Sequence, residues 1–249
     1  MVKHTKIGLI SAVPFEGKQL LKKLTKAAAP GSGVPLYTGT LSGLGILYAV
    51  SGLGKVNAAH AATLLITAHA PSLLINFGVG GAYPFSGIGV GDVALATGEI
   101  YVDEGVLLKD GLKTLDEIGI PLVRSGRIRY YNEFPLHTGR QGKVIDAALA
   151  RSQRLFPEFR VAAGPFATVS ACSGTTKRGR ELAKRFNVIC ENMEGGAVAQ
   201  VCAIHKVPLI EVRGISNLVE DRAREKWDLD QAAANCQMVL IDLIASLGD

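Results

Sequence analysis

Apolar, β-branched runs alternate with helix-like runs along the whole 249-residue chain. The runs at 6–13, 72–77, 161–171 and 208–215 are apolar at most positions, which is typical of strands buried on both faces. Alanine-rich or amphipathic stretches lie between them. The predicted helices are 15–26, 55–70, 142–155, 176–186, 194–205 and 228–247, and the other predicted strands are 36–40, 45–51, 92–97 and 188–190. This alternation predicts an α/β fold, a three-layer αβα sandwich around a central mixed, mostly parallel, twisted sheet.

The pattern continues from end to end without a linker, an internal repeat or a low-complexity segment. We therefore expect one domain that spans residues 1–249, and 48% hydrophobic residues are enough for a sizeable core. The strands at 36–40 and 45–51 flank a Ser-Gly turn and predict a hairpin. Residues 103–140 are rich in glycine, proline and charge, and we expect an elaborated, irregular loop region there.

Several features favour a cytoplasmic setting. No apolar run reaches the roughly 18 residues that a membrane-spanning helix needs. The run at 7–13 is better explained as a first strand than as a signal peptide. The cysteines show no CxxC spacing and sit in apolar segments; they are Cys172, Cys190, Cys202 and Cys236. We therefore expect a reduced protein with neither a zinc site nor a disulfide framework.

The net charge of +5 is concentrated in the middle of the chain, where residues 124–185 carry 13 basic and 4 acidic groups. Arg124, Arg127 and Arg129 form a local cluster. A nucleic-acid partner is not favoured, because no aromatic interleaving or known binding module accompanies the charge. Solvated helix faces are the simplest interpretation, and an anionic substrate group or an acidic neighbouring subunit is the alternative.

Polar residues gather where the predicted strands end, and ligands of open α/β sheets bind at the carboxyl ends of strands. The polar segments are Glu16, 78–81, 170–174, 191–194 and Ser216-Asn217. Singly, each has a structural interpretation: Glu16 and Glu194 are equally consistent with acidic first-turn residues favoured by a helix dipole. No complete GxGxxG occurs and Gly54-Lys55 lacks the flanks of a P-loop, so dinucleotide and nucleoside triphosphate sites are poorly supported.

The order and spacing of five segments give a more specific result. These are Ile7-Gly-Leu-Ile-Ser-Ala-Val-Pro-Phe-Glu16, Ser51-Gly-Leu-Gly-Lys-Val-Asn-Ala-Ala59, Ile75-Asn-Phe-Gly-Val-Gly-Gly81, Met193-Glu194 and Arg213-Gly-Ile-Ser-Asn217. Together they resemble the nucleoside phosphorylase and nucleosidase superfamily, and in particular the methylthioadenosine/S-adenosylhomocysteine nucleosidases. The resemblance implies that Glu16 activates the attacking water and that Met193 and Glu194 bind ribose. It also implies a homo-oligomer whose neighbouring subunits complete the site, and no metal or organic cofactor.

The chemistry of N-glycosidic cleavage explains these residue types. Positive charge builds on the ribose, so a carboxylate at Glu194 favours the transition state. Glu16 can take a proton from water as it attacks the anomeric carbon. Arg213 either helps to hold that water or pairs with nearby acids, and both interpretations stay open. The predicted turn at 78–81 has no arginine or serine for a phosphate, and Glu16 would repel one, so hydrolysis is favoured over phosphorolysis.

Asn217 stands where the superfamily's nucleosidases usually have an aspartate. An aspartate can be protonated and suits adenine, whereas the amide NH₂ of Asn217 can donate to a carbonyl oxygen or to N7, which suits an oxo-purine such as hypoxanthine. An amide can also flip and present its oxygen to an amino group. We expect Val79, Gly80, Ser216, Arg213 and Thr175 to contact the substrate with these residues.

Two further segments, Ile215-Ser-Asn-Leu-Val-Glu-Asp-Arg222 with Trp227 and Thr168-Val-Ser-Ala-Cys-Ser-Gly-Thr175, resemble the futalosine hydrolase group of nucleosidases. That resemblance implies hydrolysis of futalosine to hypoxanthine in an alternative route to menaquinone. The second segment replaces the aromatic residue that the methylthioadenosine enzymes set against the base. Arg127, Arg129 or Arg222 could bind the benzoate of futalosine. A methylthioadenosine-type nucleosidase, a purine nucleoside phosphorylase and a non-catalytic nucleoside-binding protein of the same fold are the alternatives.

Overall fold

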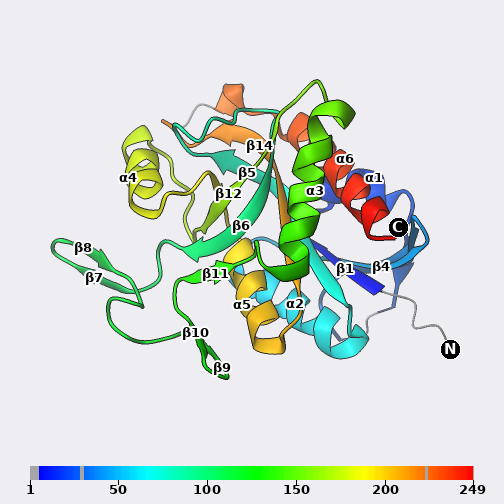
Figure 1. Cartoon of the computed structure of the whole chain (residues 1–249), viewed down its shortest axis with the longest axis horizontal. Coiled ribbons are helices and arrows are strands. Elements are labelled where there is room, and N and C mark those ends of the chain that lie inside the picture. The colour runs from blue at the N-terminus through cyan, green and yellow to red at the C-terminus, as the bar shows by residue number, and fades with distance from the viewer. Residues whose placement is uncertain (1–5, 29–30, 222–223, 249) are drawn as a thin grey trace.

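A ten-stranded mixed sheet forms the centre of the computed structural model, which describes residues 6–28, 31–221 and 224–248 (Figure 1). The predicted fold class is confirmed. The strands of this sheet are β1 (Lys6–Ser11), β2 (Thr25–Ala27), β3 (Leu36–Leu41), β4 (Leu44–Val50), β5 (Leu73–Ala82), β6 (Val93–Tyr101), β11 (Glu133–Pro135), β12 (Val161–Thr168), β13 (Cys190–Asn192) and β14 (Leu209–Leu218). The predicted hairpin is β3 and β4, which pair antiparallel across residues 41–44.

Five strands of the sheet close into a ring. β5 runs parallel to β14, β14 is antiparallel to β6, and β6 is parallel to β12. β12 is then parallel to β13, which pairs antiparallel with β5 and completes the circuit. From β5 the sheet also extends outward through β1, β4, β3 and β2. The predicted site residues at 78–81, 170–174, 191–194 and 216–217 therefore lie on or just after strands of this ring, and Glu16 follows β1, which pairs with β5.

Helices cover both faces of the sheet and give it the predicted three layers. On one face α2 (Lys55–His69) packs beside α5 (Gly195–His205), and on the other lie α1 (Lys18–Leu21), α3 (Gly139–Leu155) and α6 (Leu229–Gly248) (Figure 1). Each face has its own apolar core, because side chains alternate along a strand. On β5, Leu74 belongs to the core under α2 and α5, while Phe77 belongs to the core under α6.

Two segments differ in kind from their prediction, and the strand predicted at 188–190 lies two residues later, as β13. The expected helix at 15–26 is instead a 3₁₀ turn (Pro14–Gly17), the short α1 and strand β2, whose Thr25 pairs with Thr38 of β3. Residues 103–140 contain regular structure: the hairpins β7 (Val106–Leu108)–β8 (Gly111–Lys113) and β9 (Val123–Ser125)–β10 (Ile128–Tyr130), then β11. Strands of three residues are too short to show a hydrophobic period, so the sequence pattern missed them.

β5 and β14 extend further than predicted, and this changes how the site is built. Residues 78–81 lie within β5 and are not a turn. Ser216 and Asn217 lie within β14, where the pairing with β5 shifts by one residue between Ile215 and Asn217. Such a bulge re-aims the side chains around it. Across residues 6–28, 31–221 and 224–248, no helix combines the length and apolar character needed to cross a membrane.

Candidate active site

The carboxylate of Glu16 sits in a cradle of backbone N–H groups. Its Oε2 accepts hydrogen bonds from the N–H of Ala12 at 2.9 Å and of Val13 at 3.0 Å, and its Oε1 accepts one from the N–H of Val79 at 2.9 Å. Glu16 is 3% exposed. A carboxylate has about four acceptor positions, so the three N–H groups leave one on Oε1. The 3₁₀ turn at Pro14–Gly17, which follows directly after β1, bends the chain so that Glu16 faces its own strand end.

Gly78 makes room for this carboxylate. A Cβ atom at Gly78 would clash with Oε1 of Glu16 and would lie 2.9 Å from Nη1 of Arg213. A side chain on β5 at this point would therefore separate the first acid of the site from its buried cation. The glycine-rich run of β5 serves close approach within a strand, where glycine otherwise weakens a sheet.

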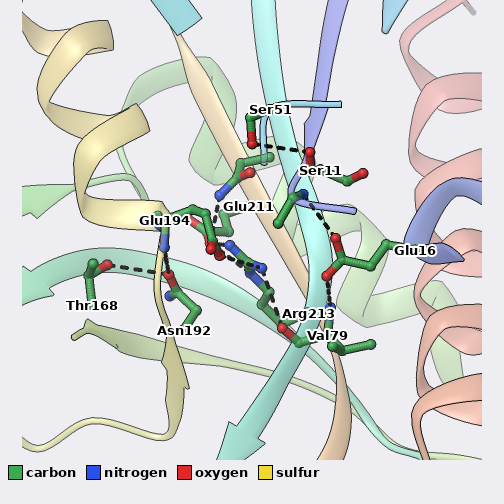
Figure 2. Close-up of polar contacts among 12 residues, drawn as sticks. Ser11, Glu16, Ser51, Val79, Thr168, Asn192, Glu194, Glu211 and Arg213 are labelled. Carbon is green, nitrogen blue, oxygen red and sulfur yellow. Dashed lines mark hydrogen bonds and ion pairs between the residues drawn. The ribbon is translucent and has the colours of Figure 1, made fainter. Parts of the chain in front are cut away.

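Arg213 is the buried cation of the site and is 1% exposed. Its Nε donates to Oε1 of Glu211 at 2.9 Å, and its Nη1 lies 3.5 Å from Oε2 of Glu194. Figure 2 shows its guanidinium between Glu16 and Glu194. Of the two interpretations left open by the sequence, the structure has Arg213 paired with acids. These pairs raise its pKa against the opposing effect of burial, so it stays charged.

Burial and the charge of Arg213 shift the pKa of Glu16 in opposite directions. Removal from water raises the pKa of Glu16 above its ordinary value of 4.5, and the positive charge of Arg213 and the N–H bonds of Val79 and Val13 oppose that rise. The pKa of Glu16 is raised overall. A carboxylate with a raised pKa is a stronger proton acceptor than an exposed one.

Glu194 is the N-cap residue of α5 but does not cap the helix with its side chain. Asn192 caps the helix instead, because its Oδ1 accepts the N–H groups of Glu194 at 3.0 Å and of Gly195 at 2.7 Å. The Glu194 carboxylate instead turns to the loop before α2, where Oε1 accepts the N–H of Gly54 at 2.9 Å. Glu194 is 3% exposed. The prediction of a carboxylate in the opening turn of this helix is confirmed to within one residue.

Asn217 has a defined amide orientation. Ser216 Oγ donates to its Oδ1 at 2.9 Å, and its Nδ2 donates to the backbone carbonyl of Leu218 at 3.0 Å. A carbonyl can only accept a hydrogen bond, so the side-chain atom beside it is the nitrogen. Leu218 takes one N–H bond of the NH₂ group, and the second remains for another acceptor.

Three other predicted contact residues lie along the same strands and turns. Val79 gives its N–H to Glu16, and its carbonyl lies 3.3 Å from Nη1 of Arg213. The carbonyl of Gly80 lies 3.3 Å from Ser216 Oγ. Met193 packs against the apolar cluster that contains Val219. A direct contact of these residues with substrate stays a prediction.

Thr175 is the N-cap residue of α4 (Thr176–Phe186). Its Oγ1 accepts the N–H of Arg178 at 3.2 Å and caps the exposed start of α4. The same loop is tied to the body by Glu191, which accepts hydrogen bonds from Ser173 Oγ at 2.6 Å and Tyr83 Oη at 2.8 Å.

The arginines suggested for the distal end of the substrate lie elsewhere in the chain. Arg127 and Arg129 are exposed on the β9–β10 hairpin, which packs at the end of α5 near Lys206. Eleven residues of α5 separate that end from Glu194, which corresponds to about 16 Å. Within one chain the hairpin is therefore remote from the Glu194 carboxylate. Arg222 lies outside the described residues.

Sequence reasoning gave no individual role to a second set of polar residues beneath the site. They are Asn76, Glu99, Thr168, Asn192 and Glu211, and all are buried. One signal could have found them: Glu211 precedes Arg213 by two positions in an apolar strand, which puts both side chains on the same face. Among the described residues, no three metal-ligating side chains lie together in a way that could hold an ion.

The fold and the sequence of this chain belong to a known class. The chain is a member of the phosphorylase superfamily, whose sequence profile matches residues 6–245. The predicted family is thereby confirmed.

The similar proteins include two kinds of nucleosidase. Over 172 residues the chain is 35% identical to a futalosine hydrolase of Thermus thermophilus, covering 69% of each chain. It is 30% identical over 250 residues to the 5'-methylthioadenosine/S-adenosylhomocysteine nucleosidase of Halalkalibacterium halodurans, covering 98% of this chain and all of that one. The Neisseria meningitidis nucleosidase of the latter type, solved with methylthio-immucillin-A, matches with a TM-score of 0.80 and 25% identity, covering 97% of this chain and 99% of that one.

Proposed function

We propose that this protein hydrolyses the N-glycosidic bond of a purine nucleoside, with water as the nucleophile and futalosine as the preferred substrate. The observation that carries the proposal is the cradle of Glu16, in which three backbone N–H groups fix a buried carboxylate and leave one acceptor position on Oε1. A fixed carboxylate with a raised pKa is suited to take a proton from an attacking water.

In the proposed reaction the water oxygen attacks the anomeric carbon of ribose while Glu16 accepts the proton. The bond from that carbon to the purine nitrogen breaks, and its electron pair leaves with the base. Glu194 contacts the ribose hydroxyls and favours the positive charge that develops on the sugar. Arg213 lies between the two acids, and its positive charge opposes the rise in the pKa of Glu16 that burial causes.

The free N–H of Asn217 is the group that we assign to the departing purine. An oxo-purine anion spreads charge onto its carbonyl oxygen, and a positioned N–H donor stabilises charge where it develops. The hydrogen bond from Nδ2 to the Leu218 carbonyl opposes a flip of this amide, because a flip would set two oxygens about 3 Å apart. This orientation supports hypoxanthine over adenine as the leaving base.

Water is favoured over phosphate by the same cradle. Phosphate sites are built from backbone N–H groups and cations. Here the N–H groups of Ala12, Val13 and Val79 already bind a carboxylate, and Arg213 is enclosed by Glu211 and Glu194. An incoming phosphate would meet Glu16 as a like charge.

The second candidate is the methylthioadenosine/S-adenosylhomocysteine nucleosidase reaction, which releases adenine. It is supported by the relative from Halalkalibacterium halodurans, since that match runs over 98% of the chain. Against it stands Asn217, where that group usually has an aspartate able to donate a proton.

The test is to incubate the protein with futalosine, inosine and methylthioadenosine, each with and without phosphate, and to identify the released base by chromatography. Hypoxanthine from futalosine without phosphate is the expected result. Adenine from methylthioadenosine as the main product supports the second candidate, and a requirement for phosphate contradicts hydrolysis. Absence of any released base would favour a non-catalytic nucleoside-binding protein.

A further inference from the structure

Two buried carboxyl groups lie directly beneath the first residue of α5. Glu99 comes from β6 and Glu211 from β14, and both are 0% exposed. A Cβ atom at Gly195 would clash with Oε1 of Glu99 and would meet Oε2 of Glu211 at 2.5 Å. The two carboxyl groups therefore converge on one point, which only a glycine at the start of α5 allows.

The hydrogen bonds around this pair leave one oxygen without a donor. Oε1 of Glu211 accepts from Nδ2 of Asn76 at 3.0 Å and from Nε of Arg213 at 2.9 Å. Oε2 of Glu211 accepts no hydrogen bond from the N–H and O–H groups of the described residues. A buried acceptor without a donor is costly, and so are two ionised carboxylates side by side. One proton held between Glu99 and Glu211 removes both costs.

The surroundings decide which carboxyl carries that proton. Glu211 contacts the guanidinium of Arg213, which favours its ionised form. Glu99 contacts no cation of the described residues: its Oε2 accepts from Thr168 Oγ1 and its Oε1 from Asn192 Nδ2, each at 2.7 Å. The neutral partner is therefore Glu99, and its O–H supplies the donor that Glu211 lacks.

We propose that a neutral Glu99 and an ionised Glu211 act as a positioning pair for the active site, holding Arg213 on one side and Asn192 on the other. The proposal rests on the proposed function and deepens it. Neither residue contacts the reacting atoms. Glu211 fixes the guanidinium that lies beside Glu194 and Glu16, and Glu99 fixes the amide of Asn192 that binds the N–H of Glu194.

The electrostatics of the neighbouring elements agree with this assignment. Burial raises the pKa of Glu99 well above its ordinary value, and the adjacent negative charge of Glu211 raises it further. Burial also raises the pKa of Glu211, but Arg213 opposes that rise. Among the described residues, the other titratable or charged groups that face the pair are Glu194 at the start of α5, Cys202 further along α5, Cys190 on β13 and Tyr101 on β6, with Glu16 beyond Arg213.

The pair predicts an asymmetry between two isosteric variants. Glu99→Gln stays neutral and its NH₂ can donate to Glu211, but an NH₂ in the place of Oε1 no longer accepts the N–H of Asn192. Loss of one hydrogen bond should lower kcat/KM by less than about 10-fold. Glu211→Gln removes the anion that balances Arg213, and kcat should fall by about 10- to 100-fold, the usual loss when a supporting group is removed. The uncompensated guanidinium should also lower the pKa of Glu16 and move the acid limb of the pH–rate profile to lower pH. Glu211→Asp should restore the position of that limb.

A second readout needs no activity. Infrared spectroscopy at neutral pH should show the C=O stretch of a protonated carboxyl group in wild type and in Glu16→Gln, and this band should be absent from Glu99→Gln. Lack of the band in wild type overturns the proposal, as does its persistence in Glu99→Gln. Equal kinetic losses in both glutamine variants, or a loss in Glu99→Gln alone, overturn it too. A wild-type protein that releases no base refutes the proposed function, and the infrared band then decides the carboxyl pair separately.

Discussion

The backbone N–H of Val79, in the middle of β5, donates a hydrogen bond to Oε1 of Glu16 at 2.9 Å. This bond joins the first turn of the chain to the central sheet at a single buried carboxylate. It also uses the backbone donor that an anionic co-substrate would need. In the proposed function, the preference for water over phosphate therefore depends on one residue at the start of the chain meeting one strand in its middle.

Replacement of Glu16 by glutamine should nearly abolish turnover. Glu16→Gln keeps the shape of the side chain but cannot accept a proton, and loss of a general base reduces kcat by about 10²- to 10⁴-fold. Steady-state release of hypoxanthine measures this loss. Binding of hypoxanthine, measured by calorimetry, should change little because in the proposed reaction Glu16 contacts the attacking water and not the base.

The matched control is Glu158→Gln, which makes the same change at an exposed residue. It should leave kcat and KM unaltered. Full activity of Glu16→Gln would remove Glu16 from the mechanism.

The activity should fall on the acid side of the pH profile. Burial raises the pKa of Glu16 above 4.5, and the base works only when ionised, so the rate declines as the pH falls through this raised pKa. Below it, kcat/KM should drop by about tenfold per pH unit. A pH profile of kcat/KM locates this acid limb, the pH range in which the rate declines. A limb at or below 4.5 would contradict the raised pKa.

Much of this site could be predicted from the sequence, because the chemistry was concentrated in short ordered segments. Glu16, Glu194 and Asn217 were found that way. The acids Glu99 and Glu211 were not, because each is one charged residue in an apolar strand and their meeting depends on β6 pairing with β14, residues far apart in the chain. The sequence also did not predict the bulge at Ser216, because glycine and polar residues in a strand-like run usually indicate that the strand ends there.

Asn217 should control which purine is released. Asn217→Asp replaces an N–H donor with an acceptor at neutral pH, and it also leaves the Leu218 carbonyl without its partner. Hypoxanthine release should fall by about 10- to 100-fold relative to adenine release, the range expected when one hydrogen bond to a leaving group is lost. Parallel kcat/KM values for futalosine and methylthioadenosine measure the ratio.

The control for this change is Gln153→Asp, an amide replaced by a carboxylate at an exposed position of α3. The ratio of kcat/KM for futalosine to kcat/KM for methylthioadenosine should be the same in this variant as in wild type. An unchanged ratio in Asn217→Asp would show that another group selects the base.

Gly195→Ala should destabilise the protein although it adds a better helix former. Alanine improves the propensity of a helix by about 1 kcal/mol over glycine. At this position, however, the new methyl group would clash with the carboxyl groups of Glu99 and Glu211. Overpacking of a buried site costs about 1–3 kcal/mol, so the net free energy of unfolding should fall. Denaturant titration measures it.

Gly89→Ala is the matched control, because a Cβ atom at Gly89 meets open space. It should change the free energy of unfolding by less than about 0.5 kcal/mol. Greater stability of Gly195→Ala than of wild type would mean that the carboxyl groups do not lie beneath this residue.

The most direct test of hydrolysis with an oxo-purine leaving group is a competition assay in phosphate-free buffer. Equal concentrations of futalosine and methylthioadenosine are mixed with the protein, and hypoxanthine and adenine are quantified over time. The ratio of the two initial rates equals the ratio of the two kcat/KM values. We predict that hypoxanthine is released in large excess at once. Adenine in excess, or no base until phosphate is added, would contradict the account.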